Sequence, residues 1–198
     1  MPTFAIFSVS ILISRISIAN HAALYPSRAP VVKQRSRQTE TYAGNGEKRM
    51  ANKYVTDEAR KQIGKTSEPR TYDVERGAIR RFAEAIEDRN PLFNSERDAR
   101  QTRFGSMIAP PTFCRSMGAP IPDIKLDMPT FRGLDGGSDW EYFVPIRPGD
   151  RITVQSKLVD LREAAGRLGP MVFTVVETTY TNQFGEVCVL QRSTGIRY

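Results

Sequence analysis

The sequence is poor in histidine and cysteine, since its 198 residues include one histidine and two cysteines. Cys114 and Cys188 form neither a CxxC pair nor a zinc-binding spacing. Both lie in apolar stretches, so we expect two buried thiols in a reducing compartment. No nucleotide-binding fingerprint, phosphate-binding loop or metal cluster is present, and we therefore predict no cofactor and no metal.

A long hydrophobic run is also absent. The apolar stretch FAIFSVSILIS at residues 4–14 has eleven residues, whereas a membrane-spanning helix needs about 20. No basic residue precedes it, so it is a poor secretory signal. Two interpretations stay open for residues 1–49: an organelle transit peptide, or an extension upstream of a true start at Met50.

In either case we predict a disordered extension at 1–49, a lead-in segment at 50–71 and a folded domain at 72–198. The expected location is the cytoplasm, or the mitochondrion if residues 1–49 are a transit peptide. We expect no membrane association.

The net charge of +7 is concentrated outside the predicted domain. Residues 1–49 hold seven of the 29 Lys and Arg residues but only two of the 22 Asp and Glu residues, so the remainder is nearly balanced. A nucleic-acid-binding domain carries its positive charge as a patch on the fold. We therefore expect no nucleic-acid partner.

The stretch DVERGAIRRFAEAIED predicts one amphipathic helix. Its apolar residues recur at the spacing of a single helical face; they are Ile79, Phe82, Ala83 and Ile86. Asp73 is the expected N-cap. Because Pro91 disfavours helical geometry at Asn90, the helix should end near Asp88.

Downstream, PPTFCRSMG predicts a short helical piece, and a long loop rich in proline and glycine follows it. The chain then alternates between β-branched or aromatic runs and turns. The expected strands are SDWEYFVPI, RITVQSKLVDL, PMVFTVVETTYTN and VCVLQRSTGIRY. One helix followed by at least four hairpin-connected strands predicts an antiparallel α+β domain.

Four phrases, in this order and spacing, resemble the MaoC-like dehydratases and in particular their N-terminal, FAS1-like dehydratase half. They are IRRFAEAIEDRNPLF, GSMIAPPTF, LDGGSDWEYFVPIRPGD and VVETTYTNQFGE, and they cover about residues 72–198. The resemblance implies a hot-dog fold, in which an antiparallel sheet wraps around one long central helix. It also implies water addition to a 2-enoyl thioester of CoA or acyl carrier protein, or the reverse dehydration.

In the family, the complete active site resembles Asp-x4-His followed by a glycine at a helix start. The carboxylate and imidazole hold and deprotonate water, and the glycine N–H stabilises the enolate oxygen. On this chain the acid falls on Asp88, the histidine position falls on Phe93, and the glycine position falls on Pro111, which has no N–H. The one histidine, His21, lies outside the domain. The chain alone should therefore be practically inert, and Asp88 is a degenerate catalytic residue or a local capping carboxylate.

Two hypotheses follow from the resemblance. In the first, this chain is the non-catalytic subunit of a heterodimeric hydratase or dehydratase, and a MaoC-like partner supplies the missing groups. In the second, it is a homodimeric protein that binds acyl thioesters without hydratase activity. A third, weaker possibility is a divergent hydratase that pairs Asp88 with Tyr142 or Tyr180.

Under the first hypothesis, four side chains are candidates for walls of an acyl tunnel, although each also suits an ordinary core: Phe93, Met107, Ile108 and Phe113. Three basic residues are candidates for contacts with pantetheine or nucleotide phosphates, although each also suits solvated surface: Arg103, Arg132 and Arg147.

Overall fold

The computed structural model describes residues 53–128, 132–166 and 169–198. The predicted extension at residues 1–49, with His21 in it, lies outside the described residues. The described elements are α1 (Asp57–Arg60), β1 (Arg70–Asp73), α2 (Arg76–Ala85), α3 (Pro91–Asn94), α4 (Glu96–Ala99), η1 (Pro111–Ser116), β2 (Gly133–Tyr142), β3 (Arg151–Gly166), β4 (Gly169–Thr181) and β5 (Val187–Arg197).

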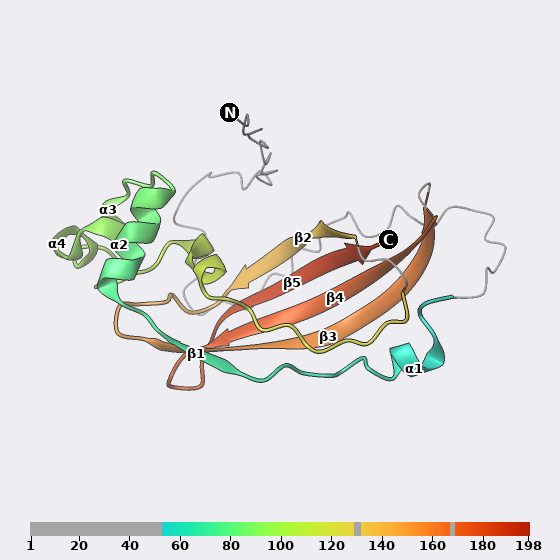
Figure 1. Cartoon of the computed structure of the whole chain (residues 1–198). Coiled ribbons are helices and arrows are strands. Elements are labelled where there is room, and N and C mark those ends of the chain that lie inside the picture. The colour runs from blue at the N-terminus through green and yellow to red at the C-terminus, as the bar shows by residue number, and fades with distance from the viewer. Residues whose placement is uncertain (1–52, 129–131, 167–168) are drawn as a thin grey trace, which may run out of the picture.

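The described strands form one antiparallel sheet in the order β1-β3-β4-β5-β2 (Figure 1). The last three strands follow the predicted runs, because long alternating β-branched sequences separated by turns favour hairpins. β2 begins at Gly133, inside the stretch predicted to be loop, and ends at Tyr142, before the end of the predicted strand. It pairs with β5 on both sides of a register shift between Asp135 and Ser138. β1 was not predicted: it is a four-residue, mostly exposed strand that pairs with the start of β3.

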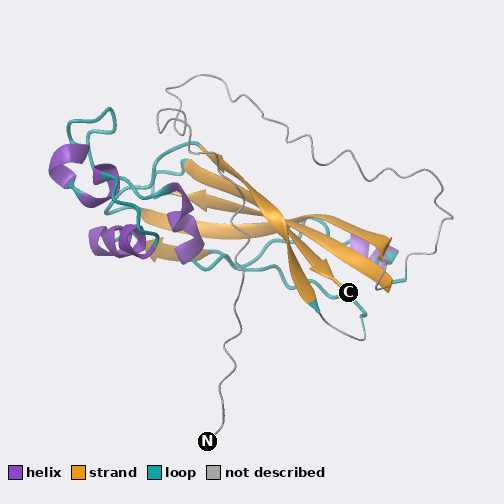
Figure 2. Ribbon diagram, turned by 90° about the horizontal axis from the view of Figure 1, so that it is seen from above, coloured by secondary structure: helices purple, strands orange, loops and turns teal. Residues whose placement is uncertain are grey.

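The helices α2, α3, α4 and η1 gather at one end of the sheet, whereas α1 lies toward the other end (Figures 1 and 2). The described parts of the segments that link α1 to β1 and η1 to β2 run along the sheet without helices (Figure 1). Residues 62–65 and 123–125 lie side by side, because the Gln62 side-chain amide exchanges hydrogen bonds with the backbone of Lys125 at 2.8 and 2.9 Å. No helix within the described parts of the chain is both long and apolar enough to cross a membrane.

α2 is shorter than its pattern predicts. Asp73 does not cap it, because this residue ends β1 and pairs with Arg151; the N-cap is Glu75, which makes no side-chain capping bond. Ile79 and Ala83 are fully buried, as expected for the apolar face. Ile86 is 46% exposed, because the helix has already ended at Ala85.

The core divides between the two ends of the sheet. The main cluster, at the helical end, includes Ile79, Met107, Phe113 and Tyr180. A far cluster joins the lead-in segment to β3 and β4; its buried members are Val55, Ala59, Leu161 and Val172. Residues 53–60 therefore belong to the folded body of the chain.

Candidate functional site

The candidate site is the loop that follows α2. Glu87 has a positive φ of 56°, the left-handed conformation that usually favours glycine. The Asp88 N–H then donates to the Ala83 carbonyl at 2.9 Å, which closes the helix end. The helix thus ends before Asp88, where the effect of Pro91 predicts its end.

Asp88 is half-buried and bonded within its own loop. Its Oδ1 accepts the Asn90 N–H at 2.9 Å, and its carbonyl accepts the Asn94 side-chain amide at 2.9 Å. Asn90 caps α3 by accepting the Leu92 N–H at 3.0 Å. The carboxylate therefore fixes the turn, as the capping interpretation of Asp88 requires.

Phe93 occupies a buried apolar position on α3. It is 2% exposed and forms a cluster with Ala83 and Ile108, against which Leu92 and Phe104 pack. The ring stands five residues after Asp88, where the resemblance calls for imidazole. An imidazole among these apolar groups would need a hydrogen-bonding partner.

The segment from Met107 to Phe113 connects this loop to the sheet. The Ile108 N–H donates to the Leu92 carbonyl at 3.3 Å, and the Ala109 N–H donates to the Ile146 carbonyl at 2.8 Å. Phe113 meets Phe82 edge to face, with ring centroids 5.5 Å apart.

The four predicted tunnel residues are each at most 4% exposed: Phe93, Met107, Ile108 and Phe113. Phe93 and Ile108 share one cluster, and Met107 and Phe113 belong to the main cluster. Their role as walls of an acyl pocket stays a prediction. Pro111 opens η1 directly after Pro110, so neither residue offers an N–H at this helix start.

The three predicted phosphate contacts lie in different settings. The Arg147 guanidinium donates to the Phe104 carbonyl at 2.9 Å and to the Ser106 hydroxyl, so it holds the loop that covers Phe93. Arg103 stacks on the Phe104 ring, 4.9 Å from its centroid. Arg132 is exposed, and its backbone pairs with that of Tyr198 at the C-terminal end of β5.

The thiols and the two candidate tyrosines are unsuited to act as bases. Burial raises the pKa of Cys114 to about 12, and the charge of Cys188 acts in the same direction. Burial also raises the pKa of Cys188 to about 12. The pKa values of Tyr142 and Tyr180 are raised by burial and, secondarily, by Cys114. All four groups stay protonated at neutral pH.

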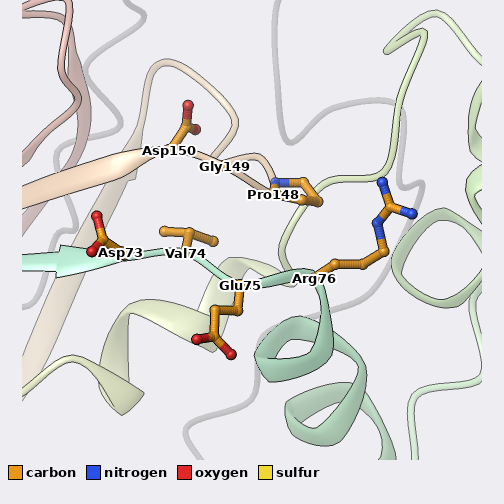
Figure 3. A pocket seen from close by; sticks show the side chains of 7 residues that line it. All are labelled: Asp73, Val74, Glu75, Arg76, Pro148, Gly149 and Asp150. Atoms are coloured by element: carbon orange, nitrogen blue, oxygen red, sulfur yellow. The ribbon is translucent and has the colours of Figure 1, made fainter.

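An open hollow of about 620 Å³ lies where β1 runs into α2, opposite the turn before β3 (Figure 3). Sequence reasoning missed it, because its two walls are far apart in the chain: residues 73–76 and 148–150. Two of the three carboxylates that line it, Asp73 and Asp150, are engaged. Asp73 pairs with Arg151 at 3.1 Å, and Asp150 accepts the Arg147 N–H at 2.7 Å and the Gln183 amide at 3.1 Å. None of the residues predicted from the sequence to form the site lines it.

This arrangement of one antiparallel sheet with short helices at one end is the hot-dog fold of MaoC-like dehydratases. The family described as "FAS1-like, dehydratase domain region" matches residues 61–191, and the chain belongs to that family.

Relatives and solved structures agree with this assignment. A UPF0336 protein of Thermobifida fusca is 34% identical over 113 residues, which is 54% of this chain and 74% of that protein. A probable enoyl-CoA hydratase alpha subunit of Thermomonospora curvata is 29% identical over 138 residues, 61% of this chain and 43% of that one. The HadBC (3R-hydroxyacyl-ACP dehydratase) complex from Mycobacterium tuberculosis superposes with a TM-score of 0.54 and 20% identity, covering 68% of this chain and 96% of that one.

Proposed function

We propose that this chain is the non-catalytic subunit of an enoyl-thioester hydratase or 3-hydroxyacyl-thioester dehydratase. A catalytic MaoC-like partner supplies the Asp-x4-His pair and the glycine N–H. This chain completes the assembly and shapes the pocket for the acyl chain of a CoA or carrier-protein thioester.

The observation that carries the proposal is the environment of Phe93. The position that resembles the family's catalytic histidine holds a phenyl ring that is 2% exposed and packed among apolar side chains. The neighbouring Asp88 carboxylate is engaged by the Asn90 N–H instead of facing a base. The loop therefore lacks the imidazole that the resemblance calls for beside Asp88.

Other groups of the chain do not replace the imidazole. A general base that works near neutral pH needs a pKa close to that pH. Burial moves the pKa values of Tyr142, Tyr180 and both cysteines upward, away from that range. This argues against the divergent hydratase that pairs Asp88 with a tyrosine.

The names of two similar proteins support a shared assembly. One sequence relative is named as the alpha subunit of an enoyl-CoA hydratase, and one structural neighbour is a dehydratase complex. Both names fit a chain that works together with a second hot-dog chain.

The test is affinity purification of the tagged full-length chain from its source cell, followed by mass spectrometry and a hydration assay on 2-enoyl-CoA. We expect a near-stoichiometric second hot-dog chain that carries Asp-x4-His, and hydration by the eluate. A mixture in which that partner's histidine is replaced by alanine is the matched control and should be inactive. Recovery of this chain alone, as an inert homodimer, would contradict the proposal and favour the homodimeric binding protein.

A further inference from the structure

The inner face of the sheet carries a partly polar region between the main cluster and the far cluster. We call it the central strip, and it consists of Ser138, Trp140, Thr174, Val176, Gln191, Ser193 and Gly195. Thr174 is 5% exposed, Gly195 is exposed, and the other members are half-buried. The middle of this face is therefore less tightly covered than either end.

Strand register places these residues on one face. On β4, Thr174 and Val176 alternate in step with Val172 of the far cluster and Tyr180 of the main cluster. Thr174 lies opposite Gly195 on β5, and Val176 lies opposite Ser193. The remaining members join through the pairs Ser138 with Ser193 and Trp140 with Gln191.

The Thr174 hydroxyl is the exceptional group of the strip. Its Oγ1 is buried and has no hydrogen-bond partner within the described parts of the chain. The neighbouring polar groups are satisfied: Gln191 donates to the Ser138 hydroxyl at 3.4 Å and accepts from Tyr180 at 3.3 Å. The Ser193 hydroxyl donates to the Val176 carbonyl at 3.5 Å. Native proteins seldom bury an unpaired hydroxyl without a use for it.

Gly195, the residue opposite Thr174 on β5, leaves open space on this face of the sheet. A Cβ added to Gly195 would meet only the Thr174 carbonyl oxygen, at 3.9 Å, within a 4 Å radius. Gly195 does not have a positive φ, so its backbone would accept any side chain. Glycine inside a strand often marks a β-bulge, a tight bend, or a site where a ligand or another backbone approaches closely; the β2–β5 pairing shifts register beside Gly195, between Asp135 and Ser138.

We propose that the central strip binds the acyl chain of the substrate and that the Thr174 hydroxyl hydrogen-bonds an oxygen atom carried on that chain. The inference rests on the proposed function, which provides the acyl thioester. The Val176 side chain and the Trp140 ring contact methylene groups, and the space at Gly195 admits the oxygen-bearing carbon. The preferred substrates are then oxygenated acyl thioesters, with a keto or hydroxyl group along the chain.

Trp140 provides the probe, because it is the one tryptophan of the sequence. Its fluorescence is followed while the full-length chain, alone and with its captured partner, is titrated with dodecanoyl-CoA. The titration is repeated with a series in which one keto group is moved along the same chain. One member should bind about fivefold more tightly than dodecanoyl-CoA, the effect of one hydrogen bond.

Two variants and a control define the site. Thr174→Val keeps the shape of the side chain and should abolish the keto preference while plain dodecanoyl-CoA still binds. Gly195→Val fills the gap and should weaken binding of every member of the series. Thr178→Val removes a hydroxyl that is already bonded to Ser156 at 2.7 Å, and it should leave the keto preference intact.

Equal affinity for dodecanoyl-CoA and every keto analogue would overturn this inference and leave the proposed function standing. A keto preference that persists in Thr174→Val would also overturn it. Failure of every acyl-CoA and of the matching acyl-carrier-protein thioesters to bind, with and without the partner, would overturn both proposals.

Discussion

Replacement of Phe93 by alanine tests whether the position that resembles the family's catalytic histidine is part of the core. A buried phenylalanine removes about 150–250 Å² from water, and at about 25 cal/mol per Å² this corresponds to roughly 4–6 kcal/mol. Alanine keeps a small part of that burial, and the neighbours relax only partly. Since Phe93 is 2% exposed among Ala83 and Ile108, we expect Phe93→Ala to lower the free energy of unfolding by about 3–5 kcal/mol.

Urea unfolding followed by Trp140 fluorescence measures this loss. Phe184→Ala is the matched control, because the Phe184 ring is 76% exposed; its effect should stay within about 0.5 kcal/mol. If Phe93→Ala costs less than about 1 kcal/mol, the ring lines an open pocket. That result would refute a core position for Phe93.

Four further predictions concern single groups. Asp88→Asn retains an oxygen that accepts the turn hydrogen bond, so we expect a stability loss below about 1 kcal/mol and no change in the hydration rate of the assembled enzyme; a loss of activity would contradict its structural role. Arg147→Met removes the bonds that hold residues 104–106, and amide hydrogen exchange there should become faster while β3 to β5 stay protected. The Cys114 thiol, with its pKa raised to about 12, should resist iodoacetamide at about pH 8 until urea unfolds the chain; because the folded-state pKa lies above the unfolded one, this thiol stabilises the fold below about pH 9, and that contribution declines as the pH rises toward 12. Thr174→Val should raise the free energy of unfolding by about 1 kcal/mol, measured by urea unfolding, because it removes an unpaired buried hydroxyl. A clear loss of stability would show that this hydroxyl has a partner.

The sequence predicts the sheet better than it predicts the loop. The long strands β3, β4 and β5 are identified by alternating β-branched residues between turns, whereas β1 has four mostly exposed residues and no apolar pattern. Pro91 predicts an end near Asp88, but α2 ends at Ala85 because Glu87 adopts a conformation that usually marks a glycine. Ile86, the last member of the expected apolar face, is consequently exposed.

At the candidate site, the sequence names candidate residues but not their partners. Asp88, Phe93 and Pro111 follow from the resemblance and the spacing. The contact of Arg147 with Phe104, 43 residues away, depends on how the turn before β3 meets the helical end. The unpaired Thr174 hydroxyl and the space at Gly195 emerge only when β4 and β5 are in register.

The most direct test of the central claim is the rate of 2-enoyl-CoA hydration by purified proteins. The chain alone, the catalytic partner alone and the two together are compared under identical conditions. Our account predicts that the chain alone is inactive, that the mixture exceeds the partner alone, and that alanine in place of the partner's catalytic histidine abolishes the activity of the mixture. Hydration by this chain alone, lost in Asp88→Asn, would contradict the account.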